Sequence, residues 1–568
     1  MNVKTDFLSR LASDIAVEPM MKHLTEFSRW QKLAGTVEEA TSLEYVRQQL
    51  DEYGFKTTLL HHDAFISLPE EASLDFNGKR ITAITHSMAI PSPEAGLTRT
   101  IIDLGKATQA DFDAVDLCDK IALINGMATP EMAKRCRLAG AAGQIHISTN
   151  HNLHEMCLSP VWGNPDVETT QELPTTCAIT VSNEDGQAIR AQLSKQPELE
   201  ATIHAKVDTG WRKTPILVAD LRAENAAKDA PFVMFSGHHD TWYEGVMDNG
   251  SANATMLEIA RCLIPHRSEM QRHLRLCFWS GHSQGRYSGS AWFADHHWHE
   301  LERDCAVHVN VDSTGGKGNT LLSLAPAATE LGALAGEAIS VHSGQEYHGA
   351  RSARNSDQSF WGIGIPSIFG ILSCQPVETP GVRNALGWWW HTPHDKIEHI
   401  DPELLLRDTR VYSHILGRLL FEDLLPLDVS AQVGDLVTQL NELTLPSEST
   451  VPLKALIAEA ETLKAALSVF QGKTPQDALA CVRRDRTLMC VSRYLVPLDY
   501  TKGDRHRHDQ ALPLPKWPSL EPLRGLSTPP QNPTAFHLHN GMAVRCANRI
   551  LSDLRQANSL LHSEGLDE

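Results

Sequence analysis

The sequence predicts a three-layer α/β/α sandwich with a mixed, mostly parallel sheet, to which two further regions are attached. Between residues 217 and 421, short apolar runs alternate with helical stretches, which is typical of a parallel sheet covered on both faces. Residues 78–213 contain short β-type runs broken by turns, and the chain after residue 425 is mainly helical. At 568 residues the chain is also too long for one hydrophobic core.

The elements divide the chain into three domains. Residues 1 to about 75 are predicted to be helical, because VEEATSLEYVRQQLDEYGF has amphipathic spacing and Gly54 supplies a stop signal. Strands and helices then alternate up to a final helix that Asp401 would cap and Pro402 would begin. The predicted domains are a discontinuous sandwich of residues 1–77 and 214–425, an inserted module of residues 78–213, and a helical domain of residues 426–568.

The composition indicates a globular cytoplasmic protein. A formal net charge of -19 without a basic run repels phosphate backbones and anionic lipid, so we expect no nucleic-acid partner and no membrane. No charge-free apolar run approaches the ~20 residues that span a bilayer. The eleven cysteines are scattered without a CxxC pair, which is typical of reduced thiols. The first residues lack the pattern of a secretion signal.

Polar residues of metal-binding type directly follow a predicted buried strand. The apolar run of residues 232–235 leads into SGHHD, and ligands bind at the carboxyl ends of strands in open α/β sheets. His238 can offer one ring nitrogen to a metal while Asp240 holds the other nitrogen. Asp248 follows on a turn. Taken alone, these residues would equally well satisfy backbone groups of a loop.

Two further strands and one loop supply residues of the same kind. A predicted strand at 274–279 leads to His282, another at 307–311 ends at Asp312, and His391 precedes the final helix. Zinc takes imidazole nitrogen and carboxylate oxygen, and it keeps an open position when it is catalytic. We therefore expect one or two divalent ions, zinc foremost, held by His238, Asp248, Asp312 and His391.

The order of these motifs resembles that of the co-catalytic zinc metallopeptidases of clan MH, which include aminopeptidase Y, glutamate carboxypeptidase II and the transferrin receptor. The matching stretches are HxD, DNGSA, GRYSGS, NVD, SDQSFWGIGIPS and HTxxD, and they cover most of residues 1–422. DKIALINGM, AGAAGQIHI and LPTTCAITVSNEDG look like a protease-associated domain. The helical tail is similar in position to the family's dimerisation domain, which implies a homodimer.

The resemblance implies a role for each matching residue. His238 and Asp312 would bind one metal, His391 would bind the other, and Asp248 would bridge the two. Asp240 would act in catalysis by orienting the His238 ring. His239 is a rival ligand to His238, but only His238 has the HxD spacing.

Other residues near the motifs are candidates for the substrate pocket. The SD pair before the GIP strand matches the family's pattern, and an arginine, a tyrosine and a tryptophan lie beside the predicted ligands. These substrate-binding candidates are Arg286, Tyr287, Asp357 and Trp390, with Ser356 helping to shape the pocket. Glu244 is close enough in sequence to Asp248 to be a substitute carboxylate, although a plain loop residue is the simpler interpretation.

The chain departs from the family at the catalytic position. The family has two adjacent glutamates after the WxxEExG strand, the first as general base and the second as metal ligand. Here the sequence reads WSGHSQG, which puts His282 and Ser283 in their place. Because loss of a positioned general base costs ~10²- to 10⁴-fold in rate, ordinary peptidase activity requires a compensating group.

Three interpretations of this departure stay open. His282 replaces the lost metal ligand, or it acts as general acid or base in catalysis, since its ordinary pKa of ~6.5 suits proton transfer. In the third, the second metal position is empty, which leaves a one-metal enzyme or a scaffold.

We expect a metal-dependent hydrolase of an amide or peptide-like bond in a small-molecule or short peptide-like substrate. The alternatives are a non-hydrolytic reaction on the same metal platform, such as cyclisation, elimination or acyl transfer, and an inactive interaction protein like the transferrin receptor.

Overall fold

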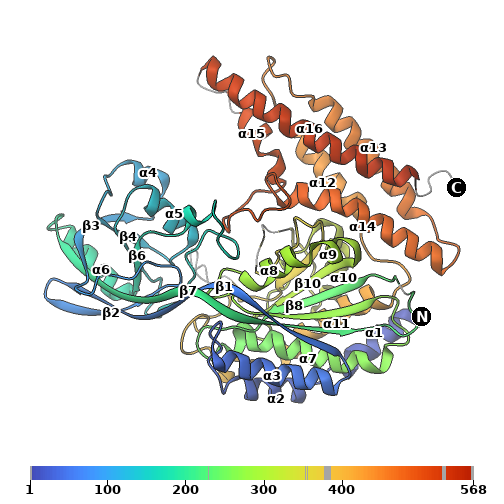
Figure 1. Ribbon diagram of the computed structural model, residues 1–568, viewed down its shortest axis with the longest axis horizontal. Coiled ribbons are helices and arrows are strands. Elements are labelled where there is room, and N and C mark those ends of the chain that lie inside the picture. Colours follow the sequence, from blue (N-terminus) through green and yellow to red (C-terminus); the bar gives the residue numbers. More distant parts are fainter. Residues whose placement is uncertain are drawn as a thin grey trace.

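The computed structural model describes residues 3–227, 229–351, 354, 356–376, 385–527 and 532–563. A central α/β body carries a β-rich lobe on one side and a helical arm on another (Figure 1). The body has a mixed, mostly parallel sheet with helices on both faces, so the predicted sandwich is confirmed. The lobe is formed by the inserted residues and the arm by the C-terminal helices.

The central sheet has the strand order β1-β7-β9-β8-β10-β11. The last four strands are parallel to one another, whereas β1 is antiparallel to β7 and β7 to β9. The bounds are β1 Lys56–Phe76, β7 Glu200–Leu221, β8 Phe232–His238, β9 His273–Trp279, β10 Cys305–Asp312 and β11 Ser367–Ile371.

Two helical layers bury the sheet. Every residue of β8 and β10 is buried, as expected for parallel strands covered on both faces. One layer contains α7 (Ala252–Leu263) and α11 (Pro402–Phe421), and the other contains α8 (Ser288–His296) and α9 (Trp298–Asp304). α10 (Gly332–Ser343) packs beside α11. The predicted cap is confirmed, because the Asp401 carboxylate accepts hydrogen bonds from the amides of Glu403 and Leu404 in the first turn of α11.

The N-terminal prediction is right for three helices and wrong beyond them. α1 (Val3–Asp14), α2 (Val17–Phe27) and α3 (Val37–Glu52) form, and Gly54 follows with a left-handed φ of 89°. Residues 56–75, predicted to be helical, lie in β1 instead. β1 pairs with β7 from Lys56 opposite Asp220 to Phe76 opposite Ala201, so pairing with a distant strand decides its conformation.

A continuous two-stranded ribbon joins the body to the lobe. β1 and β7 are 21 and 22 residues long, and they run from the central sheet into the lobe. There five strands complete an eleven-stranded sheet around a small core of their own. The lobe contains β2 Lys79–Thr85, β3 Leu97–Gly105, α4 Gln109–Asp113, β4 Ile121–Asn125, α5 Pro130–Leu138, β5 Gly143–Ile147, β6 Cys177–Val181 and α6 Asn183–Leu193.

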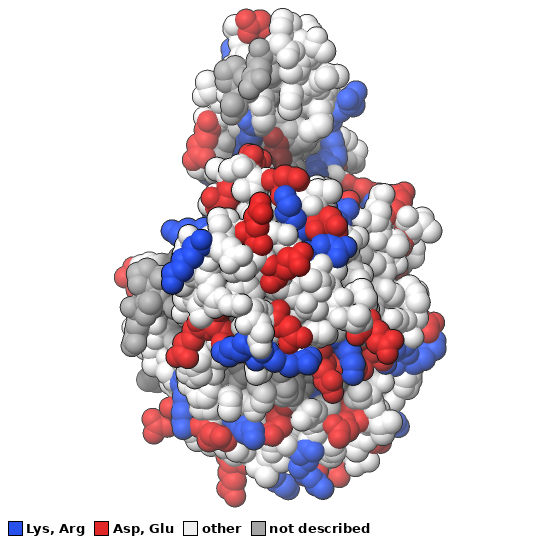
Figure 2. Space-filling model, turned by 90° about the vertical axis from the view of Figure 1, so that its left-hand side faces the viewer, with Lys and Arg blue, Asp and Glu red and all other residues white. Residues whose placement is uncertain are grey.

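The arm is a bundle of long helices that packs on the body through α14. Its helices are α12 Val429–Asn441, α13 Leu453–Gly472, α14 Ala478–Tyr500, α15 Glu521–Ser527 and α16 Pro533–Ser563. None of the helices within the described residues is long and apolar enough to cross a bilayer. On the face shown in Figure 2, acidic and basic side chains are interspersed rather than gathered in a patch of one sign.

A buried ion pair links the arm to the sheet, and its loss should destabilise the folded chain. Arg272, next to β9, binds Asp485 of α14, and the two side chains are only 2% and 3% exposed. Asp485→Asn would leave the Arg272 cation buried without a counter-charge. We expect the free energy of unfolding, measured in urea, to fall by about 3–5 kcal/mol.

The control is Glu71→Gln, which breaks an exposed pair with Lys206 and should change stability by less than ~1 kcal/mol. Equal stability of the two variants would contradict the importance of the buried pair.

Candidate metal centre and active-site cavity

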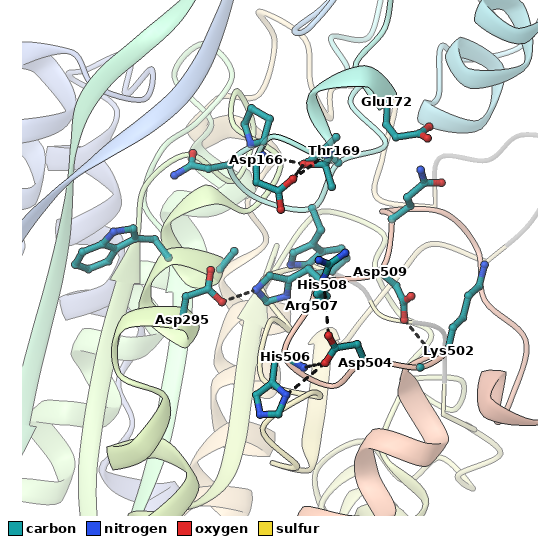
Figure 3. A pocket seen from close by; sticks show the side chains of 18 of the residues that line it. Asp166, Thr169, Glu172, Asp295, Lys502, Asp504, His506, Arg507, His508 and Asp509 are labelled. Atoms are coloured by element: carbon teal, nitrogen blue, oxygen red, sulfur yellow. Dashed lines mark hydrogen bonds and ion pairs between the residues drawn. The ribbon is translucent and has the colours of Figure 1, made fainter. Parts of the chain in front are cut away.

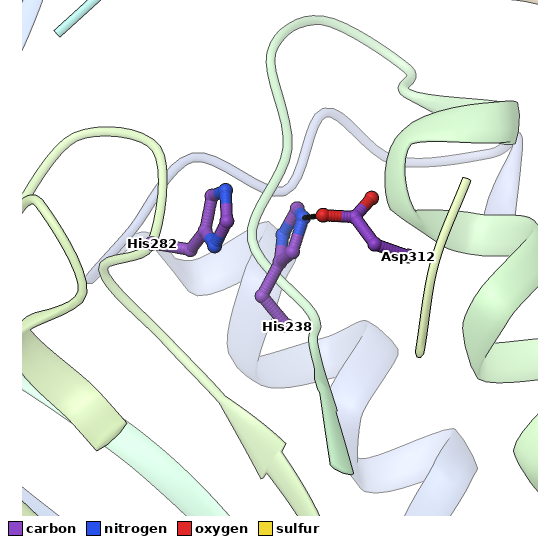
Figure 4. Close-up of side chains that lie close together, drawn as sticks. All are labelled: His238, His282 and Asp312. Carbon is purple, nitrogen blue, oxygen red and sulfur yellow. Dashed lines mark ion pairs between the residues drawn. The ribbon is translucent and has the colours of Figure 1, made fainter. Parts of the chain in front are cut away.

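The predicted metal-binding residues converge at the carboxyl edge of the central sheet. His238 is the last residue of β8, Asp312 is the last residue of β10, and His282 lies on the turn after β9. Since β8, β9 and β10 are parallel, their ends meet at one edge. Figure 4 shows the three side chains close together. One potential ligand atom from each of these three residues lies within 4.8 Å of the others.

Asp248 lies between two imidazoles. It sits on the irregular turn η2 (Val246–Ser251) that precedes α7, where its amide donates to the Asp395 carboxylate. One of its oxygens is 3.1 Å from Nε2 of His238 and the other is 3.0 Å from Nε2 of His391. On its other side, His238 Nε2 is 3.8 Å from the Asp312 carboxylate.

These separations fit a zinc-sized ion. Two atoms that each lie about 2.1 Å from one ion at a tetrahedral angle are about 3.4 Å apart. Nε2 of His238 and Oδ1 of Asp248 are also buried without a hydrogen bond within the described structure. Burial opposes protonation of His238, but the carboxylates of Asp248 and Asp312 raise the pKa of His238 well above its usual value. The cluster therefore favours a positive charge between these groups.

Main-chain carbonyls orient the two imidazoles. Nδ1 of His238 hydrogen-bonds to the carbonyl of Asp240 at 2.8 Å, and Nδ1 of His391 to the carbonyl of Glu155 at 2.6 Å. Neutral rings that donate through Nδ1 leave Nε2 as an acceptor or ligand. The sequence suggested that the Asp240 carboxylate holds the second ring nitrogen of His238, and the structure differs. That carboxylate is 3.9 Å from Nδ1 of His238 and instead accepts the amides of His282 and Ser283.

His282 stacks on His238 and is held by a buried carboxylate. The two ring centroids are 3.7 Å apart and the ring planes differ by 11°. Nδ1 of His282 lies 2.8 Å from Asp357, whose other oxygen accepts the hydroxyl of Ser290. Asp357 is fully buried behind His282, so this predicted substrate-binding residue contacts His282 rather than the cavity.

A cavity of about 190 Å³ opens beside the cluster. Residues of all the converging loops reach it, including Asp248, Asp312, His282 and His391. The substrate candidates Arg286, Tyr287 and Trp390 also line it, together with Ser356. The Trp390 ring stacks on His391 with a centroid distance of 3.5 Å.

The lobe supplies part of the cavity wall, which the sequence did not indicate. Met156 and Cys157 line the cavity, and Glu155 binds His391 through its main chain. Burial raises the pKa of the Glu155 carboxyl to about 8, and this group accepts the hydroxyl of Tyr243. No motif or spacing marks these residues, because their position depends on how the lobe folds back onto the body.

Two alternatives from the sequence lie away from the cluster. His239 faces the helical layer, where its ring packs near Phe27 and its Nδ1 meets Asn253. Burial lowers the pKa of His239 to about 3. The Glu244 carboxylate pairs with Lys396 at 3.6 Å, so it does not substitute for a missing ligand.

A larger cavity of about 690 Å³ lies between the lobe, α8 and the loop after α14 (Figure 3). Trp162 lines it and packs on Tyr287 of the smaller cavity, with ring centroids 4.4 Å apart. Two of its charged groups are paired: His508 meets Asp295 at 3.1 Å, and Arg507 binds Glu168 beside it. Within the described residues, the group of three close potential metal ligands lies at the sheet edge and not in this larger cavity.

Comparisons with known proteins agree with this arrangement. Residues 217–416 match the model of peptidase family M28. Aminopeptidase YwaD of Bacillus subtilis is 28% identical over 351 residues, which cover 59% of this chain and 70% of that protein. The fold is similar to an aminopeptidase from Aneurinibacillus sp. strain AM-1, with a TM-score of 0.55, 20% identity, and 73% and 96% of the two chains covered. It is also similar to BSAP, a zinc aminopeptidase from Bacillus subtilis, with a TM-score of 0.55, 23% identity, and 72% and 96% covered.

Zinc should stabilise the folded chain through Asp312. An ion bound only by the folded state adds about 2.7 kcal/mol at one hundred times its dissociation constant. We expect zinc to raise the thermal midpoint of chelator-treated protein and Asp312→Asn to remove most of that rise. Asp295→Asn, in the larger cavity, is the control and should respond like the wild type. An undiminished response of Asp312→Asn would exclude Asp312 as a ligand.

Proposed function

We propose that this chain cleaves amide bonds of small peptide-like substrates with His282 as general base, since residues 217–416 match the model of peptidase family M28 and the chain is similar to an aminopeptidase. The observation that carries the proposal is the contact of His282 with Asp357 at the edge of the metal cluster. It supplies a proton acceptor at the position where the family's glutamate is missing.

His238, Asp248 and Asp312 are the residues that would hold zinc. When bound there, zinc polarises a carbonyl and favours ionisation of water. The chain's own contribution is to orient these ligands through the Asp240 carbonyl and the Asp395 carboxylate, and to keep them buried.

His282 is better placed for a proton than for the ion that His238 would bind. Stacked rings in contact are about 3.5 Å apart, and imidazole binds zinc along a lone pair in the ring plane at about 2.0–2.1 Å. With the ring centroids 3.7 Å apart and only 11° between the planes, the in-plane lone pairs of His238 and His282 run side by side and do not converge on one point. A proton donor in the cavity can approach His282 Nε2 within its own plane.

Asp357 prepares His282 for this role. Nδ1–H of His282 donates to Asp357, which leaves the lone pair of Nε2 free to accept a proton from the attacking water. Burial opposes ionisation of Asp357, but His282 and Ser290 hold the pKa of this carboxyl below its usual value. The carboxylate therefore stabilises the imidazolium as it forms, and His282 can then protonate the leaving amine.

The second metal position lacks a strong third ligand. Asp248 and His391 face each other there, and Ser283 stands where the family has a glutamate. A hydroxyl is a poor zinc ligand compared with carboxylate, so we propose one tightly bound ion.

We also propose that residues 78–213 act as a protease-associated domain that completes the cavity. The support is the contact of the Glu155 carbonyl with His391 and the place of Met156 and Cys157 in the cavity wall.

Substitution of His282 distinguishes a role as general base from a role as metal ligand. We expect His282→Ala to lower kcat on a short peptide by ~10²- to 10⁴-fold, with zinc content and thermal midpoint nearly unchanged. Asp357→Asn should show a smaller loss of kcat. His296→Ala, on the far end of α8, serves as a control with full activity. If His282→Ala loses zinc in proportion to activity, His282 is a ligand, and if it stays active, His282 has no part in the reaction.

Restoring the family's glutamate should create the second site. We expect wild type to hold about one equivalent of zinc after dialysis, and Ser283→Glu to hold about two, since a carboxylate would join Asp248 and His391. Elemental analysis measures both, with Ser283→Ala as the control. Two tightly held ions in the wild type would contradict the one-ion proposal.

A further inference from the structure

Arg286 brings a cation to the wall of the active-site cavity. It lies on the turn between His282 and α8, and its Nε and Nη2 donate to the carbonyls of Ser159 and Cys157 in the lobe. The guanidinium carbon is 5.5 Å from the centroid of the Tyr287 ring. The side chain is thus fixed in place by the lobe on one side and by an aromatic ring on the other.

No carboxylate within the described residues forms an ion pair with this guanidinium, and its hydrogen bonds go to neutral groups. Arg493 provides a contrast, because each of its three nitrogens donates to a main-chain carbonyl. Arg286 gives two nitrogens to main-chain carbonyls, and its guanidinium also meets the side chain of Tyr287. Burying a cation without a counter-charge raises the free energy of the folded state. An anionic ligand in the cavity would supply the missing counter-charge.

The backbone at this turn is held in an unfavourable conformation. Arg286 and Tyr287 have φ values of 46° and 69°, which side-chain-bearing residues rarely adopt. Such positions concentrate at ligand-binding sites, where the surrounding structure maintains them. Here the conformation places both side chains in the cavity wall.

The position of Arg286 relates it to one side of the cleaved bond. In the proposed function, on which this inference rests, His282 protonates the leaving amine, so the residue after the cleaved bond lies over the turn that follows His282. Arg286 and Tyr287 are on that turn, and the amide of Tyr287 donates to the carbonyl of His282. A guanidinium fork matches a carboxylate with two parallel hydrogen bonds.

We propose that Arg286 binds a carboxylate on the residue that follows the cleaved bond. The cavity of about 190 Å³ is below the ~300–1000 Å³ of most small-molecule sites, which suits the few atoms around one peptide bond. The preferred substrates are then short peptides with an anion close to the cleaved bond. That anion is either the terminal carboxylate of a dipeptide or an acidic side chain.

Three substrates for the zinc-loaded full-length protein test this assignment. They are Ala-Ala, which has the terminal carboxylate, Ala-Ala-amide, which has none, and Ala-Glu-amide, which has only a side-chain carboxylate. We expect kcat/KM to be at least about tenfold higher for one of the two anionic substrates than for Ala-Ala-amide. The better of the two identifies which carboxylate Arg286 binds.

The variant Arg286→Gln keeps a hydrogen-bond donor but removes the charge. It should lose the preference mainly through KM, so that its kcat/KM for the anionic substrates falls toward that for Ala-Ala-amide, and Arg286→Lys should keep part of the preference. Equal kcat/KM for all three substrates in the wild type would overturn the inference and leave the peptidase proposal standing. This comparison needs no variant, so it holds even if Arg286→Gln does not fold.

Failure of the peptidase proposal gives a different result. If none of the three is cleaved, calorimetric binding of Ala-Ala and Ala-Ala-amide tests Arg286 independently of turnover. Tighter binding of Ala-Ala, or of Ala-Glu-amide measured beside it, that Arg286→Gln abolishes supports the assignment, whereas equal binding of all three ligands overturns it.

Discussion

Two carboxylates buried beside the same imidazole impose the main constraint on this molecule. Asp248 and Asp312 both face Nε2 of His238 at the edge of the sheet, where little water can screen their charges. Negative charges so close together repel each other unless a positive charge lies between them. The surrounding hydrogen bonds, from the Asp240 carbonyl to the amides that bind Asp395, keep these groups in place despite that repulsion.

His282 and Ser283 stand where the metallopeptidases that this sequence resembles have two glutamates, and they carry a different charge. A carboxylate pair would add negative charge around two ions, whereas an imidazole and a hydroxyl add none. Asp357 restores one negative charge behind His282, where it acts on the ring rather than on an ion. In the proposed function, one ion and one proton acceptor would then act together at the ends of strands β8, β9 and β10.

The sequence predicted the sandwich and the convergence of His238, Asp312 and His282, because strand ends and their polar residues follow from local patterns. It did not predict contacts set by distant pairing. β1 was expected to be helical, and its partner β7 lies more than a hundred residues away. The Glu155 carbonyl, the real partners of Asp240 and the position of Asp357 behind His282 depend on loops that meet only in the folded chain.

The continuous ribbon of β1 and β7 has a mechanical consequence for the cavity. A lobe joined by flexible linkers could swing away from the body as a unit. Here two paired strands of more than twenty residues resist bending, so they hold the lobe at a set distance from the body. Met156 and Cys157, which the lobe contributes, would then keep a fixed place in the cavity wall.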